Sequence, residues 1–264
     1  NRQPGSYCNV VGLKPTYGRT SRYGVIAMAS STDSMGTLTK TVWDNAYCLE
    51  VMAGFDPFDA TTSTKIVDDY TNKLDEFRTL KVGIPKEYFE GLDKGVEQSV
   101  REAIKALAQK GHKIVDITLP RLKYAYSMYC LTTFTEISSN LGRFDGIRYG
   151  NGRDKFADEP RRRMMIGTYA SSAGYRDKYY DQAMKARTML TQDFSDALKK
   201  VDVIAAPVGP NLPFKIGEKV FDPLSLYLED VLTVPINLAG LPAISIPCGF
   251  SKSKLPIPKV ICGL

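Results

Sequence analysis

The residues that could carry out chemistry are few and widely separated along the 264-residue chain. There is a single histidine, His112. A Ser-His-Asp or Cys-His mechanism needs a histidine in a cleft to act as the base. His112 directly follows Gly111, where the pattern predicts that a helix ends and a strand begins. We interpret it as a surface residue near a helix C-terminus, with a catalytic role as the alternative. Any hydrolytic chemistry is therefore expected to use another base.

The five cysteines do not indicate a metal site or a disulfide framework. Their number is odd, they are far apart, and no C-x-x-C pair occurs. We interpret them as small apolar residues of a protein from a reducing compartment, the cytoplasm or an organelle matrix. The cysteines are Cys8, Cys48, Cys130, Cys248 and Cys262.

The charge pattern excludes several function classes. The net charge of +6 is spread along the chain, and its densest cluster is Arg161–Arg163. A nucleic-acid module would show a basic stripe with interleaved aromatic residues, so direct binding of nucleic acid is not predicted. A basic face toward an acidic partner remains open. No phosphate-binding glycine loop occurs, and no apolar run reaches the roughly 20 residues that span a bilayer.

Hydrophobic periodicity predicts alternating helices and strands. A buried strand at 80–85, an amphipathic helix at 95–110 and a strand at 112–120 form a βαβ unit, which is typical of an α/β protein. No composition shift marks a domain boundary, so we predict one domain over residues 1–264. Other strands are predicted at 10–13, 24–28 and 201–208, and other helices at 41–53 (capped by Thr41), 124–141, 161–200 with a break near 171–174, and 223–232.

Five stretches resemble, in the same order, motifs of the amidase signature family. The similarity runs from residue 1 to about residue 250, and it implies a central mixed sheet covered by helices on both faces. Within the family, segments 138–150 and 237–250 are most similar to the glutamine-hydrolysing A subunits of tRNA-dependent amidotransferases. The five stretches are residues 10–36, 56–63, 138–150, 167–190 and 222–250.

The resemblance implies that the catalytic residues lie outside this chain. In the family the nucleophilic serine precedes an apolar residue and Arg-Gln-Pro, and here Asn1 occupies the apolar position before Arg2-Gln3-Pro4. The Ser-Ser-Lys relay is thus expected upstream of Asn1. A neutral lysine can act as its base, so no histidine is required. We expect a domain incomplete at its N-terminus, and also at its C-terminus because segment 256–259 departs from the family pattern. The isolated chain is expected to be inactive.

The resemblance also implies three substrate-binding residues. A glutamine substrate needs a cation for its carboxylate and an anion for its ammonium group. Arg163 would bind the carboxylate, with Arg162 as the alternative; Asp230 would bind the ammonium group; and Tyr129 would pack on the substrate. A solvated basic cluster, a helix-surface acid and a core tyrosine are the respective non-functional interpretations. Arg2 would support the serine pair.

The remaining expectations concern partners and loops. The resemblance implies an assembly with B and C subunits, in which the B subunit binds tRNA. ATP and Mg²⁺ would be used by the partner, with no cofactor in this chain. The product would be ammonia for amidating mischarged Glu-tRNA(Gln), and a stand-alone amidase or an inert scaffold is the alternative. Asp33, Asp56 and Asp59 are interpreted as turn or cap residues.

Overall fold

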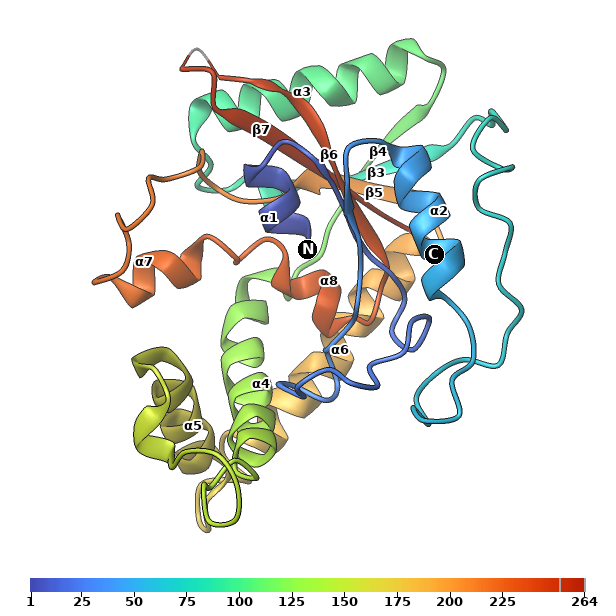
Figure 1. The fold of residues 1–264 in the computed structure, drawn as a ribbon. Helices are drawn as coiled ribbons and strands as arrows, with labels where there is room; N and C mark the ends of the chain where they lie inside the picture. Colours follow the sequence, from blue (N-terminus) through green and yellow to red (C-terminus); the bar gives the residue numbers. More distant parts are fainter. Residues whose placement is uncertain (252, 264) are drawn as a thin grey trace.

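A seven-stranded mixed sheet forms the centre of the molecule (Figure 1). The computed structural model describes residues 1–251 and 253–263. Strand β3 pairs in parallel with β4 and β5, and the other neighbouring strands pair antiparallel. The spatial order is β2 (Leu38–Thr39), β1 (Val11–Lys14), β6 (Ala243–Phe250), β7 (Pro256–Gly263), β5 (Val203–Pro207), β3 (Lys81–Pro85) and β4 (Lys113–Ile117).

Eight α-helices of the described residues surround this sheet. Short 3₁₀ turns cover Lys86–Phe89, Leu122–Tyr124 and Arg153–Lys155. The helices are α1 (Arg2–Tyr7), α2 (Val42–Met52), α3 (Lys94–Gln109), α4 (Ala125–Leu141), α5 (Asp158–Ser171), α6 (Tyr180–Leu198), α7 (Pro223–Leu228) and α8 (Val234–Leu238).

Successive side chains of β5 contact helices on opposite faces of the sheet. Ala205 packs with Ile104 of α3 on one face of the sheet. Ile204 lies in the larger core with Phe194 of α6 and Ile236 of α8, on the opposite face. Because successive strand residues point to opposite faces, these contacts place helices on both sides. The predicted mixed sheet with two helical layers is confirmed.

The βαβ unit and the first helix cap also follow the sequence prediction. Strands β3 and β4 are parallel and are joined through α3, whose Val96 and Val100 are buried. The hydroxyl of Thr41 accepts a hydrogen bond from the Asp44 backbone N–H at 3.0 Å. This bond satisfies one of the backbone donors that a helix N-terminus leaves free.

The strand predicted at residues 24–28 is wrong, because this segment is a loop. At its end, the backbone N–H groups of Met28 and of the following Ala29 bond to a side chain in place of a neighbouring strand. The carboxylate of Asp33 accepts from Met28 N at 2.9 Å and from Ala29 N at 3.1 Å. The apolar pattern alone could not reveal this local acceptor. The helix predicted at 223–232 is shorter than expected: α7 ends at Leu228, turns follow, and the separate helix α8 begins at Val234.

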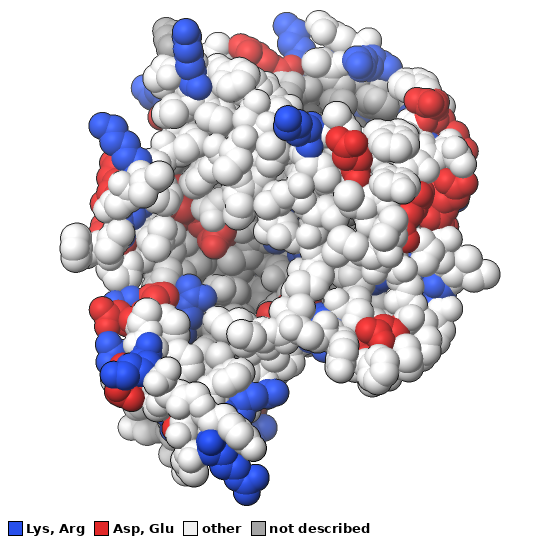
Figure 2. All heavy atoms as spheres, viewed as in Figure 1, with Lys and Arg blue, Asp and Glu red and all other residues white. Residues whose placement is uncertain are grey.

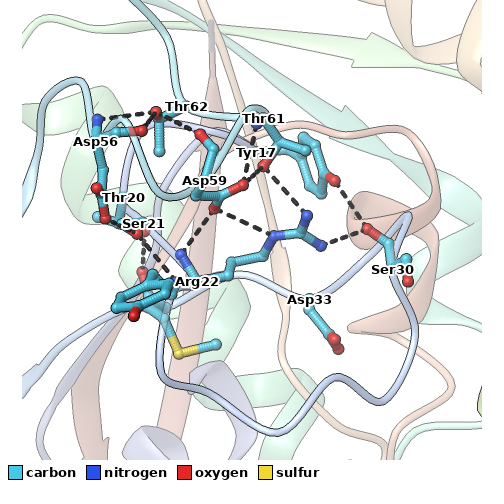
Figure 3. Close-up of polar contacts among 12 residues, drawn as sticks. Tyr17, Thr20, Ser21, Arg22, Ser30, Asp33, Asp56, Asp59, Thr61 and Thr62 are labelled. Atoms are coloured by element: carbon cyan, nitrogen blue, oxygen red, sulfur yellow. Dashed lines mark hydrogen bonds and ion pairs between the residues drawn. The ribbon is translucent and has the colours of Figure 1, made fainter. Parts of the chain in front are cut away.

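A polar network fixes two loops against each other (Figure 3). Asp59 is 8% exposed and accepts from the backbone N–H of Arg22 at 2.9 Å and from the hydroxyl of Thr61 at 2.7 Å. Asp56 accepts from the Ser21 hydroxyl at 2.6 Å. The Thr61 hydroxyl bond first, and then the Arg22 backbone bond, lower the pKa of Asp59 to about 2. The interpretation of these aspartates as turn residues is confirmed.

Helices α4 and α5 pack closely because Gly167 has no side chain. A Cβ atom at Gly167 would lie 1.9 Å from the backbone oxygen of Phe134 in α4. Since real Cβ atoms essentially never approach that closely, only glycine fits at this crossing. This contact sets how far α5 stands from α4, and both helices carry predicted site residues.

Candidate functional site

The predicted site residues come from three separate segments that meet beside the N-terminus. Tyr129 lies on α4, Arg163 on α5, and Asp230 between α7 and α8. In Figure 1 the N-terminus lies in the middle of the molecule, near α1 and α8. Figure 2 shows a hollow in the surface at this place, with acidic atoms at its upper margin and basic atoms at its lower left margin.

Tyr129 is influenced electrostatically by both Arg163 and Asp230. Its ring packs edge-on against Phe134, with centroids 6.1 Å apart. Burial raises the pKa of the Tyr129 hydroxyl, the guanidinium of Arg163 opposes this rise, and the carboxylate of Asp230 adds to it. Both charged groups therefore act on the same phenol. The neutral hydroxyl can donate or accept a hydrogen bond at ordinary pH.

Arg163 is enclosed by aromatic rings and one carboxylate. Its guanidinium carbon lies 5.2 Å from the ring centroid of Phe134 and 5.7 Å from that of Tyr227. Its Nε donates to Oε1 of Glu159 at 2.6 Å. Burial lowers the pKa of Arg163, but the bond to Glu159 and the neighbouring tyrosines produce a net rise, so the side chain stays charged.

Arg162 differs from Arg163 in its surroundings. The side chain of Arg162 is 40% exposed, against 24% for Arg163. Arg162 bonds through Nη1 to Oε2 of Glu159, and Arg163 also acts electrostatically on Tyr129. The geometry thus favours Arg163 over Arg162 as the arginine that belongs with Tyr129 and the surrounding aromatic rings.

Asp230 sits at the N-terminal end of α8, partly buried. Its Oδ1 accepts from the hydroxyl of Thr233 at 3.1 Å. The carboxylate of Asp230 acts electrostatically on the backbone nitrogen of Asn1, so Asp230 lies close to the first residue of the chain.

Two basic side chains, Arg2 and Lys14, are buried close enough to act on each other electrostatically. Arg2 is 6% exposed, and its backbone oxygen accepts from the hydroxyl of Ser245 at 3.0 Å. Lys14 is 5% exposed and donates through Nζ to the Pro15 backbone oxygen at 2.9 Å. Burial, followed by the charge of Arg2, lowers the pKa of Lys14 to about 7. Arg2 is thus buried at the start of α1. Its role in supporting a serine pair stays a prediction.

Sequence reasoning missed the residues that hold the charged groups in place. Glu159 and Tyr227 surround Arg163, and Lys14 is buried at the end of β1. The spacing of Glu159 and Arg163, four residues apart on a helix, could have indicated their ion pair. Nothing in the local pattern indicated that Tyr227, which lies far beyond Arg163 in the chain, would join them, because that contact depends on the tertiary fold.

His112 lies just after the C-terminus of α3, as predicted, but it is half-buried and not fully on the surface. Its Nδ1 accepts from the Leu80 backbone N–H at 3.2 Å, and its ring lies 5.6 Å from that of Phe77. It therefore ties the start of β3 to the end of α3. Cys8, Cys48, Cys130 and Cys248 form no disulfide in the described part of the chain, and Cys8 is exposed while the other three are half-buried.

The arrangement places a cation, Arg163, and an anion, Asp230, in electrostatic reach of one phenol, Tyr129, with aromatic rings packed against the cation. Such a pair can bind the carboxylate and the ammonium group of a free amino acid. The structure brings Tyr129, Arg163 and Asp230 together, and their roles in binding remain predictions. Among the described residues, every helix is too short or too polar to cross a bilayer.

Comparison with protein families identifies the class. The family model described as Amidase matches residues 1–263, and the chain belongs to this family. The chain is similar to the A subunit of glutamyl-tRNA(Gln) amidotransferase from Thermodesulfovibrio yellowstonii, with 48% identity over 278 residues, and from Geobacillus kaustophilus, with 47% identity over 279 residues. Each alignment covers 99% of this chain and 57% of the relative, so the chain spans little more than half of their length.

Solved structures show the same fold. The A subunit of glutamyl-tRNA(Gln) amidotransferase from Thermotoga maritima superposes with a TM-score of 0.83 at 42% identity, covering 99% of this chain and 56% of that one. The 6-aminohexanoate cyclic dimer hydrolase complexed with substrate gives a TM-score of 0.82 at 24% identity, covering 99% and 58%. At this lower identity the similarity concerns the fold alone.

Proposed function

We propose that the whole protein to which this chain belongs is the glutamine-hydrolysing subunit of a glutamyl-tRNA(Gln) amidotransferase. The convergence of Arg163 and Asp230 on the hydroxyl of Tyr129 supports this proposal most directly. The similarity to amidotransferase A subunits at 47% and 48% identity agrees with it. Arg163 binds the α-carboxylate of glutamine, Asp230 binds its α-ammonium group, and Tyr129 packs on the side chain.

The reaction releases ammonia, which amidates mischarged Glu-tRNA(Gln) on a partner protein. The relatives are A subunits by name, which supports an assembly with B and C subunits, in which the B subunit binds tRNA. We assign ATP and Mg²⁺ to the partner and no cofactor to this chain. The cytoplasm, or an organelle matrix, is the proposed location.

The segment of residues 1–264 is proposed to bind substrate without cleaving it. The Ser-Ser-Lys relay of the amidase signature family has no match within these residues. A glutaminase rate measured on this segment alone would contradict the assignment. Glutamine hydrolysis is expected only from the full-length protein.

The proposal is tested on the full-length protein by comparing glutamine with a plain aliphatic amide. The proposed pair of charges predicts a clear preference for glutamine, because a plain amide has no carboxylate for Arg163 and no ammonium group for Asp230. Arg163→Ala should raise KM for glutamine about tenfold or more, with a smaller change in kcat. Preference for the plain amide would instead support a stand-alone amidase, and an unchanged KM would rule out the role of Arg163.

A further inference from the structure

We propose that Glu159 is a positioning residue that orients Arg163 toward the substrate carboxylate. This inference rests on the proposed function of Arg163. Glu159 lies one helical turn before Arg163 on α5, and its Oε1 accepts from Nε of Arg163 at 2.6 Å. Glu159 does not take the place of the substrate, because it uses the Nε side of the guanidinium and leaves the terminal nitrogens to other partners.

The guanidinium group of Arg163 is fixed in both its plane and its rotation. The rings of Phe134 and Tyr227 lie 5.2 Å and 5.7 Å from its central carbon, and cation–π contacts of this kind hold a guanidinium over a ring. The bond to Glu159 then sets the direction of Nε. A guanidinium carries five N–H donors in a rigid fork, so fixing Nε also fixes the edge formed by the two Nη nitrogens.

This Nη edge is the one suited to a second carboxylate. A carboxylate binds two parallel N–H donors of arginine with the greatest strength. Arg163 contacts an internal carboxylate through Nε, which leaves its Nη edge for the carboxylate of the substrate.

The local charges match a monoanionic group. Glu159 also accepts from Nη1 of Arg162, so two arginines share one carboxylate. The cluster has a net charge of one positive unit. A single substrate carboxylate would neutralise this remaining charge, whereas loss of Glu159 would leave two adjacent cations that repel each other.

Glu159 also connects α5, which carries Arg163, to α7, which precedes Asp230. The hydroxyl of Tyr227 donates to Oε1 of Glu159. Tyr227 belongs to α7 and shortly precedes Asp230, so this bond joins α5 to the segment that carries the proposed ammonium-binding residue. The separation between Arg163 and Asp230 is thereby held by Glu159, and that separation has to match the distance between carboxylate and ammonium groups.

The test is Glu159→Gln in the full-length protein, assayed with glutamine and with 4-aminobutanamide, which lacks the α-carboxylate. We expect KM for glutamine to rise about three- to tenfold with kcat changed less than about twofold. The kcat/KM for 4-aminobutanamide should stay unchanged, because that substrate does not use Arg163. Asp158→Asn is the matched control, since Asp158 is an exposed neighbour that pairs with Arg161; it should alter neither substrate.

The outcomes separate this inference from the proposed function. If Arg163→Ala raises KM for glutamine and Glu159→Gln does not, only the role of Glu159 is overturned. Equal losses with both substrates in Glu159→Gln would show a general structural role and would also overturn it. If Arg163→Ala leaves KM unchanged, the proposed function itself fails.

A second variant keeps the inference testable if Glu159→Gln does not fold. Tyr227→Phe retains the ring beside Arg163 and removes only the hydroxyl bonded to Glu159. We expect a smaller rise of about two- to threefold in KM for glutamine, again without an effect on 4-aminobutanamide. A variant indistinguishable from the parent with both substrates would contradict the positioning role.

Discussion

The hydroxyl of Tyr7 donates to Oε2 of Glu229 at 2.6 Å, which joins residues 222 positions apart in the chain. Glu229 is 1% exposed and also accepts from Asn211 at 3.0 Å and from Lys219. Because Glu229 directly precedes Asp230, this bond attaches the candidate ammonium-binding segment to α1. Burial acts to raise the pKa of Glu229, but its hydrogen bonds with Lys219, Tyr7 and Asn211 produce a net decrease.

Tyr7→Phe is expected to lower the free energy of unfolding by about 1–3 kcal/mol at neutral pH, because it deprives a buried carboxylate of a donor. A folded-state pKa below the unfolded value contributes stability above the unfolded pKa, and that contribution is lost as the pH falls through the folded pKa. The difference in the free energy of unfolding between Tyr7→Phe and the parent should therefore become smaller at acidic pH. Urea denaturation of both proteins measures it, with Tyr47→Phe on exposed α2 as a control. An equal loss in the control would contradict the assignment.

Gly167→Ala is expected to separate α5 from α4. The added methyl group would lie 1.9 Å from the Phe134 backbone oxygen, so the helices must move apart. This movement should lower stability by about 1–3 kcal/mol and raise KM for glutamine in the full-length protein, since Arg163 moves with α5. Thr168→Ala, at the exposed neighbouring position, is the control. A variant with parental stability and KM would show that this crossing does not position the site.

Lys14→Met should change how stability depends on pH. The pKa of Lys14 is about 7 in the folded chain, against roughly 10.4 in an unfolded chain. Between these values the unfolded state holds a proton that the folded state lacks, so Lys14 makes stability rise with pH. The free energy of unfolding of Lys14→Met should exceed that of the parent most at about pH 6, and the difference should be smaller by about pH 10. Urea denaturation across this range checks it, and a constant difference would contradict the lowered pKa.

Asp59→Asn should weaken the contact between the loops of Figure 3. The amide side chain provides one acceptor oxygen where Asp59 uses two, so about 1–3 kcal/mol of stability should be lost near neutral pH. Since the folded pKa of Asp59 is about 2, its contribution is present above the unfolded value and is lost as the pH falls toward 2. Thermal unfolding at several pH values measures this. Asp68→Asn, at a position 59% exposed, should have little effect.

Much of the framework could be predicted from local patterns. Val96 and Val100 recur at helical spacing and are buried in α3, and the parallel pairing of β3 and β4 follows from the βαβ order. The loop at 24–28 could not be predicted, because its apolar residues resemble a strand while the N–H groups of Met28 and the following Ala29 bond to Asp33. Motif resemblance selected Tyr129, Arg163 and Asp230, but it gave no distance between them.

The sequence alone therefore determined most of the helices, the strands β1, β3, β4 and β5, and the family, since these depend on periodicity and on short motifs. It did not predict β6 and β7, which lie in the middle of the sheet. Only the tertiary structure decided which charges lie together. Glu159 is a near neighbour of Arg163 in the chain, but Tyr227 reaches both only because the tertiary fold brings its side chain to α5. The depressed pKa of Lys14 likewise arises from burial beside Arg2. Desolvation and Coulomb interactions depend on distances in space, which the order of residues does not specify.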